Sequence, residues 1–166
     1  MKVLGIDPGL ANCGWALIET YDKEYRLVSF GEVKTYKSSN KTSDFSSRLK
    51  KIFVEFKKIL LKYHPDVVCI EKQFYSKIAK NMIDTYVALG VIYLLCGLLN
   101  IEVKEFSAKT IKVAISGYGS ATKLQLKKMI KLLLNQEKDI KSEHINDAIA
   151  TALCYLNTSM DFVSYV

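Results

Sequence analysis

Three acidic residues and one histidine stand at positions from which their side chains could share divalent cations. Asp7 ends the opening apolar run and is followed at once by Pro-Gly, a strong turn signal. Glu71 ends a second apolar run, and His144 and Asp147 lie three residues apart on one face of an expected C-terminal helix. Oxygen and nitrogen ligands of this kind predict a divalent-metal site. On a basic chain, such a site favours chemistry on phosphodiesters.

Two strands and one helix must position these residues. If the strands that end at Asp7 and Glu71 are neighbours, both carboxylates emerge at one edge of a sheet. The small residues Ala148, Ala150 and Ala152 would let the C-terminal helix lie close to that sheet. Because like charges at short range repel, the site should be stable only with cations bound or protons shared. Two divalent ions roughly 3.5–4 Å apart would assist hydrolysis of a scissile phosphate.

Each of these elements also has an ordinary structural interpretation. An aspartate before Pro-Gly is most often a turn former, and a glutamate that closes a buried strand is more often solvated or salt-bridged. His144 and Asp147 alone would usually mark a helix surface, and Glu143 beside them could simply favour the helix start. The combination in this chain order favours the metal site.

Length and composition are those of one globular domain spanning residues 1–166. Hydrophobic residues make up 49% and charged residues 25%, and the formal net charge is +7. Between residues 104 and 131 the sequence contains a single acid, Glu105. The lysines of the same segment are Lys104, Lys109, Lys112, Lys123, Lys127, Lys128 and Lys131. Such a run is either a binding face for a polyanion or a solvated surface.

The four cysteines show no C-x-x-C pairing, and three lie in apolar runs, where a free cysteine usually packs as a small hydrophobe. The chain begins directly with a predicted strand, so we expect no signal peptide and a reducing, cytoplasmic setting. The apolar run at 87–99 is too short to cross a bilayer, so we expect no membrane contact.

The hydrophobic pattern predicts an α/β fold. Strands are expected at 2–6, 13–19, 25–35, 67–71 and 102–106, with a polar loop at 37–43. Helices are expected from residue 44 to just before Pro65, and at 78–99, 109–115, 122–135 and 142–157. This order predicts a mixed five-stranded sheet, an antiparallel three-strand meander plus two parallel strands, flanked by helices.

Four motifs carry a family resemblance: GIDPG at residues 5–9, IEKQF at 70–74, GYGSATK at 117–123 and HINDA at 144–148. Together, in this order and over nearly the whole length, they resemble the RuvC-type Holliday-junction resolvases, endonucleases of the ribonuclease H-like superfamily. The first motif alone is weak, because other members of the superfamily share it.

The resemblance implies that Asp7, Glu71, His144 and Asp147 are catalytic and hold Mg²⁺ or Mn²⁺, two ions per active site. Relatives have either aspartate or histidine at the position of His144. Imidazole suits Mn²⁺ better than Mg²⁺, so we expect higher activity with Mn²⁺ and a loss of activity in acid as the imidazole protonates. Glu143 is an alternative ligand, although it points about 100° around the helix from His144.

The same resemblance implies contacts with DNA. Phe74 would stack on unpaired bases near the crossover, unless it is a core or interface residue. Lys112 and Lys123 would contact phosphate at the active centre, as catalytic or anchoring cations, and Lys72 would add a further DNA contact.

The loop at 117–120 is a second implied DNA contact. Through Gly117, Gly119 and Ser120 it could offer backbone amides to a phosphate. Its ordinary interpretation, a helix entry capped by Ser120 or Thr122, is compatible with that role.

By resemblance, the chain is an enzyme that resolves four-way DNA junctions by paired symmetric nicks in recombination and repair. A two-fold homodimer matches the symmetry of such a junction, and a branch-migration motor is an implied partner. The helix at 78–99 is the expected dimer surface, through Ile83, Val87, Val91 and Leu94, unless it serves only the core of its own chain.

Three alternatives remain at this stage. One is an actin-like nucleotide-binding protein, another a ribonuclease H-like nuclease acting on ribosomal RNA precursors, and the third a non-catalytic junction-binding module.

Overall fold

The computed structural model describes residues 1–22, 24–36, 44–72, 82–136 and 139–163. The described residues form one five-stranded sheet with the spatial order β3-β2-β1-β4-β5. β1 (Lys2–Asp7), β2 (Asn12–Tyr21) and β3 (Glu24–Lys34) form an antiparallel meander. β4 (Val67–Glu71) pairs parallel with β1, and β5 (Glu102–Phe106) pairs parallel with β4. The predicted mixed sheet is confirmed.

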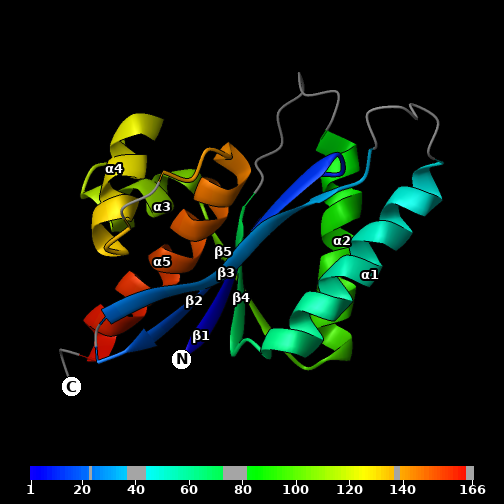
Figure 1. Cartoon of the computed structure of the whole chain (residues 1–166), viewed down its shortest axis with the longest axis horizontal. Helices are drawn as coiled ribbons and strands as arrows, with labels where there is room; N and C mark the ends of the chain where they lie inside the picture. The colour runs from blue at the N-terminus through cyan, green and yellow to red at the C-terminus, as the bar shows by residue number, and fades with distance from the viewer. Residues whose placement is uncertain (23, 37–43, 73–81, 137–138, 164–166) are drawn as a thin grey trace.

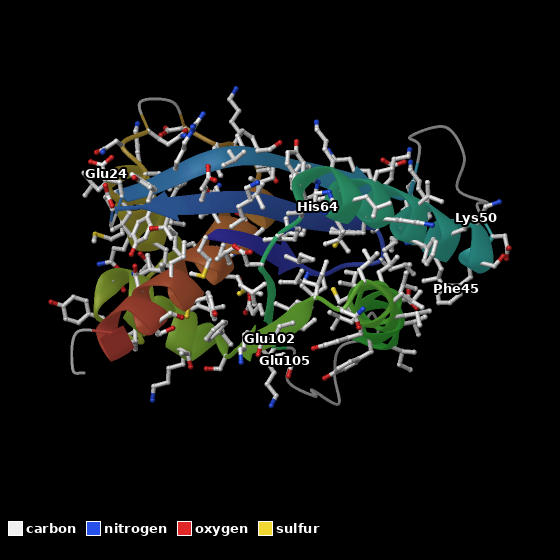
Figure 2. All side chains as sticks on the ribbon, turned by 90° about the horizontal axis from the view of Figure 1, so that it is seen from below. Glu24, Phe45, Lys50, His64, Glu102 and Glu105 are labelled. Atoms are coloured by element: carbon white, nitrogen blue, oxygen red, sulfur yellow. The ribbon has the colours of Figure 1, made fainter. Side chains whose placement is uncertain are left out.

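Helices cover both faces of this sheet (Figure 1). α1 (Phe45–Tyr63) and α2 (Met82–Leu98) lie on one face, and α3 (Ala108–Ser116), α4 (Lys123–Leu133) and α5 (Glu143–Val163) lie on the other. Each face has its own apolar core. Figure 2 shows side chains filling both layers, with Glu24 at the β3 edge and Glu102 and Glu105 at the β5 edge.

The sequence pattern explains α1. The buried side of α1 repeats every four residues, at Arg48, Ile52, Phe56 and Leu60, as one stripe of an amphipathic helix should. The helix ends because a residue before proline is disfavoured in the right-handed helical region. His64 accordingly has φ 46° and donates its backbone N–H to Leu60.

α5 lies against the sheet at very short range. A Cβ atom on Gly5 of β1 would stand 2.0 Å from the carbonyl oxygen of Ala148, and one on Gly14 of β2 would stand 2.2 Å from that of His144. Glycine is therefore required at both sheet positions for the helix to approach. The helix contributes its own small buried residues, as predicted: Ala148, Ala150 and Ala152.

The main differences from the predicted elements concern two helices. α5 continues to Val163, beyond the expected end at residue 157. Asn157 does not terminate it, because its amide group donates to Ala114 and accepts from the Tyr25 hydroxyl. For α2, the expected start at 78–81 lies outside the described residues, as does the expected loop at 37–43. None of the helices described here is long and apolar enough to cross a membrane.

Candidate active site

Asp7 and Glu71 emerge at the same edge of the sheet. The parallel register of β1 and β4 pairs Val3 with Val67 and continues to Ile6 with Ile70. Each acid is the next residue of its strand. The prediction that these two strands are neighbours is confirmed.

α5 brings His144 onto Asp7. The Nδ1 atom of His144 lies 2.7 Å from Oδ2 of Asp7, and the Asp7 side chain is only 15% exposed. Gly14 makes this contact possible, because it pairs with Asp7 across β1 and β2 and also leaves room for the backbone of His144. The glycine is a functional position that the sequence analysis missed.

Electrostatics shows that the acids form one cluster. Burial, together with the charge of Asp147, raises the pKa of Asp7, against the opposing hydrogen bond from His144. Burial and the charges of Asp7 and Asp147 raise the pKa of Glu71 to about 6. Burial also raises the pKa of Asp147. Each carboxylate is thus unfavourable as an anion until a cation or a proton compensates it.

Both lysines expected at the active centre lie within electrostatic range of these acids. Lys112 and Lys123 each act to lower the pKa of Glu71. The Lys123 ammonium is 2.7 Å from Oε2 of Glu143 and 3.8 Å from Oδ2 of Asp147. Glu143 is 74% exposed and hydrogen-bonded to Lys123, so here it acts as the partner of that lysine.

The turn between α3 and α4 uses several of its amides within the protein. Gly117 has φ 79°, which favours glycine, and its N–H donates to Val113 at the end of α3. Thr122, and not Ser120, is the N-cap of α4, in a capping box with Gln125. Of the two capping residues that the sequence offered, Ser120 and Thr122, the structure uses Thr122.

Of the other residues expected to contact DNA, Gly119, Ser120 and Lys72 are described by the structure. Gly119 packs beside the aliphatic part of Lys109, and Ser120 is exposed. Lys72 is exposed directly after Glu71, and its backbone N–H donates to Phe106. Phe74 lies outside the described residues.

The donor set suits divalent cations, although its side chains do not stand in a ready-made cage. Within the described ranges, no group of three or more His, Cys, Asp or Glu side chains is arranged to hold a metal ion. The hydrogen bond between Asp7 and His144 occupies one oxygen and one nitrogen of the donor set. Burial, the largest cause, raises the pKa of Asp7, Glu71 and Asp147, and a bound cation would stabilise their ionised forms.

Comparison with known proteins places the chain in a family. Residues 3–155 match the family described as crossover junction endodeoxyribonuclease RuvC. The RuvC of Caldicellulosiruptor saccharolyticus is 39% identical over 160 residues, covering 96% of this chain and 94% of the relative. That of Halothermothrix orenii is 37% identical over 158 residues, covering 95% and 93%.

A solved structure gives the same fold. Thermus thermophilus RuvC in complex with a Holliday junction substrate superposes with a TM-score of 0.89 at 23% identity, covering 98% of this chain and 96% of that one. With the acids gathered at one sheet edge and the family match spanning nearly the whole chain, this protein belongs to the crossover junction endodeoxyribonuclease RuvC family.

Proposed function

We propose that the chain resolves four-way DNA junctions by paired symmetric nicks through metal-assisted hydrolysis of phosphodiesters, in recombination and repair. The observation that carries this proposal is the cluster of Asp7, Glu71, His144 and Asp147, in a chain that matches the family over residues 3–155. The family match speaks against the nucleotide-binding and ribosomal-RNA alternatives, and four competent donor side chains speak against a non-catalytic module.

In this proposal, Asp7, Glu71, His144 and Asp147 hold two divalent ions, which when bound supply Lewis-acid stabilisation of charge on the phosphate. The chain supplies buried carboxylates, and burial makes a bound cation stabilise their ionised form more than it would stabilise a solvated carboxylate. The imidazole of His144 favours Mn²⁺ over Mg²⁺ as the preferred ion.

Several further groups contact the DNA in this proposal. Lys112 and Lys123 neutralise phosphate charge, and the exposed Lys72 adds a backbone contact. The turn containing Gly117, Gly119 and Ser120 follows the DNA backbone beside Lys123, and Phe74 stacks on unpaired bases at the crossover.

The proposed assembly is a homodimer of single-domain chains in the cytoplasm, which works with a branch-migration motor. Two active sites related by a two-fold axis match the two equivalent strands of a four-way junction. The four cysteines are all buried and free, which suits a reducing compartment.

Cleavage of a synthetic mobile four-way junction tests the function directly, beside a linear duplex and an RNA duplex, in Mg²⁺ and in Mn²⁺. We expect paired, symmetric nicks in the junction alone, abolished by Asp7→Asn while junction binding persists. Asp22→Asn is the matched control, because it makes the same change in an exposed hairpin turn. Absence of cleavage in either metal, or equal cutting of duplex or RNA, would overturn the proposal.

A further inference from the structure

A cavity adjoins the acid cluster on the side of α1 and α2. Its volume is about 360 Å³. It is lined by the turn from Pro8 to Asn12, which directly follows Asp7, and by His144, which bonds to Asp7. The other walls are Tyr36, Arg48, Asp84 and Thr85. Because it shares His144 and the Asp7 turn with the acid cluster, any group bound in it would lie beside the scissile phosphate.

Arg48 is held rigidly in the wall of this cavity. Its side chain belongs to a residue that is only 7% exposed. Its Nε donates to the Thr35 hydroxyl at 3.0 Å, and that hydroxyl donates to the carbonyl oxygen of Leu10 at 2.6 Å. The guanidinium carbon lies 3.8 Å from the centre of the Tyr36 ring, so the planar group is stacked on an aromatic face.

Arg48 forms no ion pair within the described part of the chain. Among the described residues no carboxylate lies within 4 Å of the guanidinium, and its terminal amino groups have no hydrogen-bond partner in that part of the chain. Arg48 is nine-tenths buried as a residue, but its amino groups open to solvent in the cavity, since Thr20 Oγ1 is the only fully buried side-chain N/O atom without a partner among the described residues. A guanidinium fork matches two oxygens of a phosphate or carboxylate. A cation fixed in this way at a cavity wall has the geometry of an anion-binding site.

We propose that the Arg48 cavity binds a backbone phosphate of the cut DNA strand, next to the scissile phosphate. This inference rests on the proposed junction-cleaving function. The strand would pass from Lys123 and Lys112, across the acid cluster, to Arg48 on the opposite side. Asp84 also lines the cavity, and its carboxylate opposes an anion, so the phosphate engages the Arg48 wall.

The proposal is tested by measuring junction binding in EDTA at several salt concentrations. Loss of one phosphate contact lowers the slope of log K against log salt by a known amount. Arg48→Gln should weaken binding by about tenfold and reduce the slope of log K against log salt by about 0.9. Arg48→Lys keeps the charge and should retain most of the slope. An unchanged slope in Arg48→Gln would overturn the proposal.

Two control variants separate phosphate binding from other roles. Thr35→Val removes the hydroxyl that orients Arg48 but keeps the cation, so it should weaken binding less than Arg48→Gln does and retain most of the salt slope. Asp84→Asn removes the opposing charge and should leave binding unchanged or tighter. If Asp84→Asn instead weakened binding in a base-dependent way, the cavity would be a nucleobase site and the proposal would be wrong.

A further measurement uses the wild-type chain, in case the Arg48 variants fail to fold. Neutral methylphosphonate is placed at each phosphate within a few nucleotides of the cut. Binding should weaken at positions on both sides of the scissile phosphate, on one side through Lys112 and Lys123 and on the other through Arg48. Weakening on one side only would contradict the inference. If the wild type did not bind the junction in preference to duplex, the proposed function itself would fail, which is a distinct result.

Discussion

The buried carboxylate of Glu71 lowers the folding stability of the metal-free protein at neutral pH. Its pKa is raised to about 6 by burial and by the negative charges of Asp7 and Asp147. A folded-state pKa above the ordinary 4.5 means that the folded protein binds this proton more tightly than the unfolded chain does. Wild-type stability therefore falls as pH rises from 4.5 to about 6, and the loss persists above that range.

We predict that Glu71→Gln stabilises the metal-free protein at neutral pH. The shift corresponds to at most about 2 kcal/mol, and partial solvation of the carboxylate reduces this to about 1 kcal/mol. Urea unfolding in EDTA at pH 4.5 and pH 7.5 should show a small difference between variant and wild type at the lower pH and the full difference at the higher. A difference that does not depend on pH would contradict the electrostatic origin.

In the proposed site, we expect the imidazole of His144 to set the preference for one metal over another. We predict that His144→Asp, which makes the donor set entirely oxygen, lowers the ratio of Mn²⁺-supported to Mg²⁺-supported cleavage by about tenfold. Calorimetric titration of each metal should show the same change in relative affinity. His64→Asp is the control, because this second histidine is exposed at the end of α1. Equal ratios in wild type and His144→Asp would argue against histidine as a ligand.

Sequence alone located the acids and the neighbouring Lys112, Lys123 and His144, but not all of the contacts that the lysines and other cations make. Asp7 and Glu71 were predictable because an acid at the end of an apolar strand is a local pattern. The pairing of Lys123 with Glu143 was not, because it joins the starts of two helices 20 residues apart. In the sequence, Arg48 is one polar residue among others on an amphipathic helix. Only the tertiary structure shows that it is buried against Tyr36 and Thr35.

At the level of elements, the contact of α5 with β1 and β2 assembles the site. We predict that Gly14→Ala forces the start of α5 away from the sheet, because the added carbon would lie 2.2 Å from the carbonyl oxygen of His144. Overpacking of this kind costs about 1–3 kcal/mol. The loss of cleavage should exceed what instability explains, since the contact between His144 and Asp7 depends on this approach.

Thermal unfolding and cleavage at a temperature where Gly14→Ala remains folded would separate the two effects. Gly97→Ala in α2 is the stability control, because its added carbon meets nothing within 4 Å. Wild-type activity in a destabilised Gly14→Ala protein would show that α5 can shift without harm to the site.

Most elements were predictable from sequence because their hydrophobic period and breakers are local. The limits of β4 and β5 match the expected ones, and α1 ends just before Pro65 as expected. The end of α5 was not predictable, because Asn157 is held by Tyr25 and Ala114 from distant parts of the chain. On the sheet side, Gly5 and Gly14 gave no sequence signal for a helix contact, since neither stands in a turn.

For the whole molecule, α2 presents an apolar face for the proposed dimer. Ile83 is 75% and Leu94 is 58% exposed, whereas Val91 packs against the core of its own chain and Val87 is half-buried. With about 100° per residue, Val91 is turned some 80° from Ile83, toward the sheet. The dimer surface expected from the sequence therefore stays a prediction, with Ile83 and Leu94 as its exposed members and Val87 and Val91 half-buried. The exposed face is formed by Ile83, Tyr86, Gly90, Leu94 and Leu98.

We predict that Leu94→Lys converts the proposed dimer to monomers without unfolding the chain, because an exposed charge in an apolar interface is desolvated on association. Sedimentation equilibrium should show the change in mass. Single-strand nicking should persist, while the fraction of junctions cut on both strands falls, since one monomer carries one site. Leu61→Lys is the control, because it makes the same change at an exposed position of α1. A stable Leu94→Lys dimer, or paired nicking by a monomer, would place the two-fold contact on another surface and leave the apolar face of α2 free for a different partner.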